Sequence, residues 1–270
     1  MQNSFLVDGA ADAAISPADR GLAYGDGVFR TLRVRQGRPE CWPLHFRKLE
    51  EDCRALEIVC PSEDALLGDL DALFRDGGDG VAKIIVTRGD SARGYAVPLE
   101  GASRRIVSRS PLPRYPESWY SDGVDLHLCR LRLSAQPRLA GVKHLNRLEN
   151  VLARMEWSSP QLAEGLLRDE EGWVIEGTMS NVFLRSGTIL RTPSFQRCGV
   201  AGVTRARILE AAPGIGLDAR VGSISLQRLA AADEVVICNS LIGVLQVRSM
   251  GEYRWQNAGL AEKLRERLGL

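Results

Sequence analysis

Lysine is scarce in this chain of 270 residues, where it occurs four times while arginine supplies most of the positive charge. Histidine is rarer still, and His45, His127 and His144 do not stand at metal-ligand spacing from cysteine or carboxylate residues. The six cysteines form no Cys-x-x-Cys pair, and several lie in apolar runs, which is typical of buried thiols in a reducing cytoplasm. The sequence therefore predicts a cytoplasmic protein without a metal centre.

Long apolar runs and an excess of one charge are also absent. No segment approaches the roughly 20 consecutive apolar residues of a membrane span, and the first residues have neither the basic nor the apolar segment of a signal peptide. Because 35 basic and 34 acidic residues are well mixed, the net charge of +1 gives no general attraction to nucleic acid or to a membrane. The sequence therefore predicts neither a nucleic acid nor a membrane as a partner of this chain.

The patterning of apolar residues predicts an α+β protein of two domains. Three prolines in the six residues 111–116 cannot continue a central strand or helix, so we place a linker at 114–120, between domains at 1–113 and 121–270. The first, smaller domain is expected to be an α/β sandwich, and the larger, strand-rich second domain a barrel-like α/β unit. Expected strands cover 4–7, 28–35, 39–42, 81–87, 105–110, 124–133, 165–168, 174–176, 182–185, 188–190, 234–238 and 243–247, and expected helices cover 44–56, 63–74, 204–212 and 258–268.

The contexts of the four lysines differ. Lys143 follows a Gly-Val pair and precedes a helix-like run, whereas Lys263 lies on an amphipathic helix, Lys83 in a strand pattern and Lys48 on a predicted helix. An amine can lose its proton and form a covalent imine with an aldehyde, which a guanidinium cannot do. From the local pattern alone, a surface lysine at a helix start is an equal alternative for Lys143.

Other segments combine glycine with small polar residues. Glu176 stands at a strand end before Gly-Thr-Met-Ser-Asn181, where a carboxylate could meet a heterocycle nitrogen, and Thr204 stands where a glycine-rich loop opens onto a helix that could bind phosphate. Each segment alone also fits an ordinary turn or helix cap. Together with Lys143, which could bind an aldehyde, they indicate pyridoxal phosphate as the cofactor.

The order of these motifs resembles the fold-type IV family of pyridoxal-phosphate enzymes over nearly the whole chain. The motifs are Tyr24-Gly-Asp-Gly-Val-Phe29, Lys143, Glu176-Gly-Thr-Met-Ser-Asn181 and Gly202-Val-Thr-Arg205. The family contains branched-chain aminotransferases, D-amino-acid aminotransferases and aminodeoxychorismate lyases. Three pieces resemble the lyases in particular, namely Arg88-Gly-Asp-Ser-Ala-Arg-Gly-Tyr95, Gly141-Val-Lys-His-Leu-Asn-Arg-Leu-Glu-Asn150 and Asp233-Glu-Val-Val-Ile-Cys-Asn-Ser240.

This resemblance implies a role for each matching residue. Lys143 would hold the cofactor covalently and act as a base, Thr31 would transfer a proton near the leaving group, and Glu176 would face the pyridine nitrogen. Further cofactor contacts are implied for Lys48, Ser180, Asn181, Val203, Thr204 and Ser240, and substrate contacts for Tyr24, Arg93, Tyr95 and Asn239. The implied reaction converts 4-amino-4-deoxychorismate into 4-aminobenzoate and pyruvate, a step in folate biosynthesis, and the implied assembly is a homodimer.

One position departs from the family pattern. The family usually has His-x-x-Arg-Leu in its first long helix, with the arginine on the cofactor phosphate, but this chain has Lys48 at the arginine position. An ammonium can bind phosphate as a point charge without the bidentate fork of a guanidinium. The alternative is that Arg47 turns inward, which requires the helix to be rotated by one residue.

Two other functions are compatible with part of this set of motifs. A D-amino-acid aminotransferase would share the cofactor and the base, but those enzymes tend to have Arg-x-His where this chain has Arg93-Gly-Tyr95. A relative that has lost its chemistry and serves as a binding protein is the other alternative. The joint presence of Lys143, Glu176, Thr204 and Thr31 argues against that second alternative.

Overall fold

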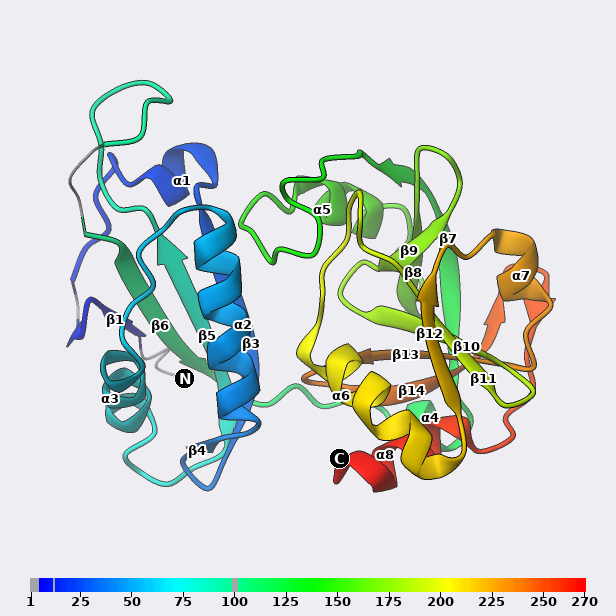
Figure 1. Ribbon diagram of the computed structural model, residues 1–270. Helices are drawn as coiled ribbons and strands as arrows, with labels where there is room; N and C mark the ends of the chain where they lie inside the picture. Colours follow the sequence, from blue (N-terminus) through cyan, green and yellow to red (C-terminus); the bar gives the residue numbers. More distant parts are fainter. Residues whose placement is uncertain (1–4, 12, 99–101) are drawn as a thin grey trace. The chain divides into compact units, whose positions relative to one another are not determined.

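The computed structural model describes residues 5–11, 13–98 and 102–270, and the chain divides into two compact units (Figure 1). The first unit contains Met1–Pro113 together with Val142–Asn146, and the second contains Arg114–Gly141 and Arg147–Leu270. The α+β class and the two-domain organisation predicted from the sequence are confirmed. Ser4, the first residue of the first predicted strand, lies outside the described residues.

The first unit is built on a six-stranded sheet in which every pairing is antiparallel. In sheet order the strands are β2 (Ala10–Ala11), β1 (Phe5–Val7), β6 (Arg104–Ser110), β5 (Gly80–Thr87), β3 (Gly27–Arg35) and β4 (Arg38–Pro39). The helices of this unit are α1 (Arg20–Tyr24), α2 (Trp42–Ala55) and α3 (Glu63–Leu73). Helix α3 begins at the predicted cap, because the Ser62 hydroxyl accepts a hydrogen bond from the Ala65 N–H at 3.3 Å.

The strand predicted over 39–42 is wrong. Strand β4 ends at Pro39, and Trp42 already belongs to helix α2. The proline that follows Trp42 lies in the first helical turn, where its fixed φ and missing N–H suit a helix start. A sequence that is apolar enough for a strand has therefore formed the first turn of a helix.

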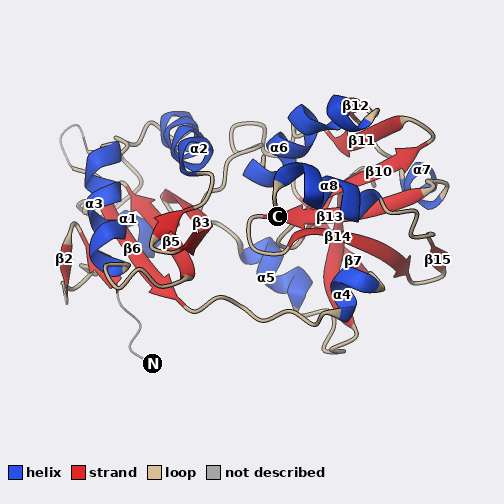
Figure 2. Ribbon diagram, turned by 90° about the horizontal axis from the view of Figure 1, so that it is seen from below, coloured by secondary structure: helices blue, strands red, loops and turns tan. Residues whose placement is uncertain are grey.

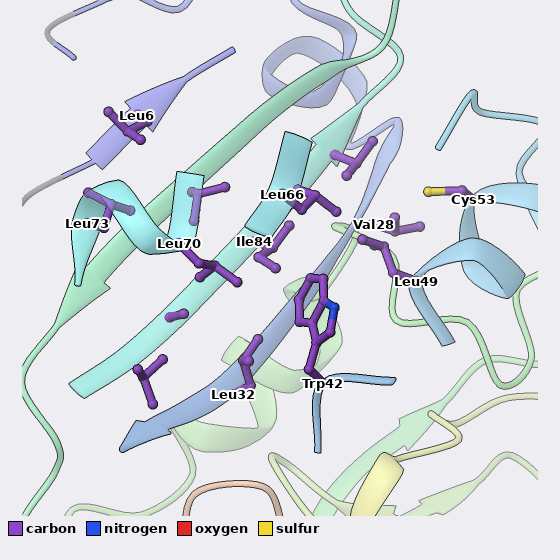
Figure 3. Close-up of a cluster of buried hydrophobic side chains, with 14 of the residues drawn as sticks. Leu6, Val28, Leu32, Trp42, Leu49, Cys53, Leu66, Leu70, Leu73 and Ile84 are labelled. Carbon is purple, nitrogen blue, oxygen red and sulfur yellow. The ribbon is translucent and has the colours of Figure 1, made fainter. Parts of the chain in front are cut away.

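One apolar cluster joins both long helices to the sheet (Figure 3). Leu49 of α2 and Leu66 of α3 pack with Leu32 and Ile84 of the central strands, and all four are at most 1% exposed. Because successive side chains of a strand point to opposite faces, the buried set of β3 leaves Phe29 and Thr31 on the other face of the sheet.

The short segment Val142–Asn146 belongs to the first unit, although the sequence placed it in the domain 121–270. Backbone hydrogen bonds explain the difference. The Phe29 N–H donates to the Lys143 carbonyl at 2.9 Å, and the Leu145 N–H donates to the Gly27 carbonyl at 2.9 Å. The segment thus pairs with the start of β3, and Lys143 is held by the first unit's sheet.

The second unit contains a nine-stranded sheet that mixes antiparallel pairs with the parallel pairs β11–β12, β14–β7 and β7–β8. In sheet order the strands are β12 (Asp218–Gly222), β11 (Ile189–Pro193), β10 (Asn181–Ser186), β13 (Glu234–Asn239), β14 (Gly243–Met250), β7 (Val124–Leu133), β8 (Leu162–Asp169) and β9 (Val174–Gly177), with β15 (Tyr253–Arg254) paired to β14. Figures 1 and 2 show β13 and β14 running across the direction of β7, so the sheet curls as the barrel-like prediction requires. A register shift between Val247 and Ser249 helps the sheet to bend there.

The helices of the second unit are short. They are α4 (Ser118–Ser121), α5 (Leu148–Arg154), α6 (Val203–Ala211), the 3-10 helix η1 (Ala212–Ile215), α7 (Leu226–Ala230) and α8 (Leu260–Leu268). Ile208 of α6 and Leu264 of α8 are fully buried against Phe183 and Val236, so these two helices cover one face of β10 and β13. None of the helices in the described part of the chain is both long and apolar enough to cross a membrane.

Candidate active site

Lys143 lies beside the face of the first unit's sheet that carries Phe29 and Thr31. Its backbone is fixed by β3, and its ammonium nitrogen lies 4.3 Å from the centroid of the Phe29 ring. Phe29 and Thr31 alternate with the core residues of β3 and therefore point to the same side. The structure thus brings together the two residues that the sequence predicted to be catalytic.

The same face carries a second lysine. Lys83, on β5, is the direct cross-strand partner of Thr31. Its ammonium nitrogen lies 5.3 Å from the centroid of the Phe29 ring, and its side chain is exposed. Two ammonium groups beside one ring make this side of the sheet positively charged, which favours anionic ligands there.

A buried carboxylate supports Lys143 from the other side of β3. Asp52 of helix α2 is 0% exposed and accepts hydrogen bonds from the Arg30 guanidinium, the Lys48 ammonium and, at 3.3 Å, the Lys143 backbone N–H. Asp52 could not be recognised from the sequence, because it lies 91 residues from Lys143 and belongs to no motif. Asp52 therefore joins helix α2 to the segment that carries the lysine.

Helix α2 turns Lys48, not Arg47, toward the interior of the first unit. The Lys48 side chain is only 17% exposed, whereas Arg47 is exposed to solvent. Burial, aided by the nearby charge of Arg30, lowers the pKa of Lys48 to about 8, and Glu51 opposes this change. Lys48 is therefore an ammonium at neutral pH that can lose its proton just above it.

The loop predicted to hold the substrate is shaped by Arg20 and Tyr24. The Arg20 guanidinium donates to the backbone carbonyls of Gly94, Tyr95 and Ala96, each at 3.2 Å. The Gly94 N–H donates to the Tyr24 hydroxyl at 3.2 Å, and the rings of Tyr24 and Tyr95 lie 5.2 Å apart. Tyr95 is 83% exposed.

The other predicted substrate residue of this loop is Arg93, whose side chain is also exposed. The backbone of the loop is thus held at three successive carbonyls while its long side chains face solvent. Such a loop can present Arg93 and Tyr95 to a ligand without a change of backbone shape.

Glu176 occupies the end of β9 in the second unit and is 3% exposed. Its Oε2 accepts hydrogen bonds from the Val200 N–H at 2.8 Å and from the Asn181 amide at 3.4 Å. Burial lowers the pKa of Arg147, and the negative charge of Glu176 opposes this effect. The arrangement presents a fixed, buried carboxylate, as the partner of a protonated ring nitrogen requires.

The start of helix α6 is held by Asn181. The Asn181 amide donates to the Val200 carbonyl at 2.9 Å, and its Oδ1 accepts from the Gly202 N–H at 3.2 Å. A side chain at position 202 would collide with this oxygen, so the sequence needs glycine there. Gly202 is the N-cap residue and provides no side-chain cap, so the first turn of α6, with the buried Val203 and Thr204, keeps the donors and the dipole that bind anions.

Two other predicted residues, Ser180 and Asn239, form hydrogen bonds within the second unit. Ser180 donates to the buried Glu164 at 2.9 Å. The Asn239 amide donates to the Met179 carbonyl at 3.0 Å, and its oxygen accepts two backbone N–H groups of the turn that contains Ser240. The sequence missed Glu164, because its partners in the turn lie 14 to 16 residues away.

Each unit therefore gathers part of the predicted set. Lys143, Thr31 and Lys48 lie on or beside β3 in the first unit, whereas the cofactor residues of the second unit cluster around the β9–β10 turn and the start of α6. That cluster consists of Glu176, Ser180, Asn181, Val203 and Thr204. Within the described part of the chain there is no group of histidine, cysteine and carboxylate side chains able to hold a metal ion.

Comparison with known proteins identifies the family. The model of the amino-transferase class IV family matches residues 27–250. An aminodeoxychorismate lyase from Vibrio harveyi is 35% identical over 244 residues, covering 90% of both chains, and one from Bacillus subtilis is 31% identical over 249 residues, covering 90% of this chain and 84% of the relative. The crystal structure of 4-amino-4-deoxychorismate lyase from Pseudomonas aeruginosa has 50% sequence identity and a TM-score of 0.94, covering 98% of this chain and 97% of that one. The chain therefore belongs to the amino-transferase class IV family, which confirms the resemblance seen in its motifs.

Proposed function

We propose that this protein is a pyridoxal-phosphate-dependent lyase that converts 4-amino-4-deoxychorismate into 4-aminobenzoate and pyruvate, a step toward folate. The structural observation that carries the proposal is the placement of Lys143 and Thr31 on one side of the first unit's sheet, beside the Phe29 ring. The names of the two curated relatives and of the Pseudomonas enzyme support the same reaction.

The residues present fit pyridoxal phosphate. Lys143 supplies the amine for its aldehyde, Glu176 the buried carboxylate for its ring nitrogen, and the first turn of α6 the donors for its phosphate. Thr204, the Val203 N–H, Ser240 and Lys48 would complete the phosphate contacts. When bound, the cofactor supplies an electron sink for the charge left by a broken C–H bond.

The chain's own residues would handle protons and orientation. Lys143 would take the proton from the ring carbon that bears the substrate amine. Thr31 would donate a proton to the enolpyruvyl group as it leaves, which yields pyruvate, and the ring becomes aromatic. Arg93 would hold a substrate carboxylate, with Tyr24, Tyr95 and Asn239 shaping the remaining contacts.

A product assay tests this reaction. Purified protein supplied with pyridoxal phosphate and 4-amino-4-deoxychorismate should release 4-aminobenzoate and pyruvate in equal amounts. The runner-up function, a D-amino-acid aminotransferase, would instead release more pyruvate from D-alanine plus 2-oxoglutarate. Absence of 4-aminobenzoate would overturn the proposal, and a protein that stays colourless after cofactor addition would favour a binding protein that has lost its chemistry.

Substitution of Lys143 isolates its role. Lys143→Ala removes both the covalent link and the base, and loss of general acid–base help alone typically costs about 10²–10⁴-fold, so activity should fall by more than that. Borohydride treatment should attach the cofactor covalently to Lys143 of the wild type and leave the variant unlabelled. Lys263→Ala, on the terminal helix α8, is the matched control and should keep both labelling and activity.

We also propose a cytoplasmic homodimer. All six cysteines are free thiols, as a reducing compartment maintains them. Helix α5 and its C-cap residue Met155 expose large apolar side chains at helical spacing, which is typical of a surface that another protein covers. These are Leu148 (68% exposed), Val151 (52%), Leu152 (48%) and Met155 (73%).

A further inference from the structure

Glu164, near the start of β8, is a buried carboxylate on which the turn between β9 and β10 closes. It is 3% exposed. Its Oε1 accepts the N–H groups of Gly165 at 2.9 Å and Thr178 at 3.1 Å and also the Thr178 hydroxyl. Its Oε2 accepts the Met179 N–H at 3.0 Å and the Ser180 hydroxyl at 2.9 Å. All of these contacts are donors to the carboxylate, and four of them come from three consecutive residues of the turn.

The turn is closely packed around Gly177. The Gly177 N–H donates to the Ser180 carbonyl at 2.7 Å, which closes the backbone of the turn. A side chain at Gly177 would collide with the Ser180 hydroxyl and would lie 3.0 Å from the carboxyl carbon of Glu164. Glycine at this position and a carboxylate at Glu164 are therefore two parts of one local structure.

The turn joins two residues of the candidate active site. Glu176 stands immediately before Gly177, and Asn181 immediately follows Ser180. These two side chains in turn bind the backbone of Val200, and Asn181 also binds Gly202 at the start of α6. A change in the shape of the turn would therefore move the carboxylate for the ring nitrogen and the loop that leads to the phosphate donors together.

We propose that Glu164 is a positioning residue for cofactor binding, an inference that rests on the function proposed above. Its carboxylate sets the shape of the turn at residues 178–180 before any ligand arrives, so that Glu176 and Asn181 already hold their binding positions. Preorganisation of this kind raises affinity because the ordering cost is met during folding. Glu164 itself need not touch the cofactor or the substrate.

The variant Glu164→Gln keeps the size of the side chain but puts an NH₂ group where an oxygen accepts hydrogen bonds. The NH₂ group then faces N–H or hydroxyl donors of the turn, which lose their acceptor. Because hydrogen bonds to a charged group are stronger than those between neutral groups, pyridoxal phosphate should bind the apo-variant about tenfold more weakly or worse in an absorbance titration. Hydrogen exchange of the Thr178 and Met179 amides in the apo-protein should be faster than in the wild type.

A second buried glutamate of the same unit provides the matched control. Glu234 is 1% exposed and accepts the N–H groups of Ala258 at 2.8 Å and Leu260 at 3.1 Å, together with the Arg185 guanidinium at 2.7 Å. It therefore caps the start of α8 as Glu164 caps the turn. Glu234→Gln should lower the melting temperature to a similar extent and leave the cofactor affinity unchanged.

A milder variant covers the case in which Glu164→Gln does not fold. Thr178→Val removes one hydroxyl donor from the carboxylate and preserves shape, so it should weaken cofactor binding in the same direction by a smaller factor. Wild-type cofactor affinity in both Glu164→Gln and Thr178→Val, with a loss of stability like that of Glu234→Gln, would show that Glu164 is only structural. If the wild-type protein binds the cofactor but makes no 4-aminobenzoate, the proposed reaction is wrong, whereas the proposed role of Glu164 in cofactor binding is unaffected.

Discussion

At the residue scale, a substitution of Thr31 can distinguish its proposed role in proton transfer from the role of Lys143. Thr31→Val keeps the shape of the side chain and removes the hydroxyl that we expect to act on the leaving enolpyruvyl group. Lyase turnover should therefore fall by about 10²-fold or more, while cofactor affinity and any half-reaction with D-alanine should change little. Stopped-flow absorbance and product assays measure these quantities separately. Equal slowing of both reactions would make Thr31 a packing residue of β3.

Loss of the Lys48 charge should make the affinity for the cofactor depend on pH. With the pKa of Lys48 lowered to about 8, its ammonium is present at pH 7 and lost as the pH rises through 8. If Lys48 binds the cofactor phosphate, affinity should fall between pH 7 and 9 in the wild type. Lys48→Arg keeps the charge over this range and should flatten that profile, whereas Arg47→Ala should leave it unchanged. A steep profile in Lys48→Arg would assign the dependence to another group.

The site residues that the sequence predicted lie within contiguous motifs, whereas those that it missed do not. Lys143, Glu176 and Thr204 stand inside contiguous motifs, and glycine beside them marks places where backbone approaches closely. Asp52 and Glu164 act through contacts with residues far away in the chain, so no local pattern marks them. Supporting carboxylates of this kind can be recognised only from the structure, in which their hydrogen-bond donors lie around them.

At the element scale, the long segments with clear periodicity were predicted well. Helices α2 and α3 and strands β5 and β7 begin and end within two residues of their expected limits. The sequence missed α1, α4, α7, η1, β2, β12 and β15, each of five residues or fewer, because such segments are too short to show a period. The barrel-like curl was expected from strand content, but the strand order depends on pairings between distant residues.

The start of helix α6 offers a test at this scale. Gly202→Ala would force a methyl group against Asn181 Oδ1 and break its hydrogen bond with the Gly202 N–H. We expect a stability loss of about 1–3 kcal/mol, typical of a buried acceptor left unsatisfied, and a cofactor affinity at least about tenfold lower. Gly222→Ala, at the end of β12, meets nothing within 4 Å and should keep both properties. Denaturant unfolding and cofactor titration measure the two effects.

At the scale of the whole molecule, assembly depends on surfaces that folding leaves apolar. Leu148 of α5 and Met155, the C-cap residue of that helix, are 68% and 73% exposed, so exchange for glutamate should change the stability of one chain by no more than about 0.5 kcal/mol. If the proposed homodimer uses this face, Leu148→Glu combined with Met155→Glu should shift sedimentation from dimer to monomer at micromolar concentration, because charges at the core of an interface are strongly disfavoured. Val59→Glu, at a 69% exposed site of the first unit, is the matched control and should remain dimeric. A double variant that still sediments as a dimer would place the contact on another surface, and a wild-type monomer with full lyase activity would remove the homodimer from the proposal.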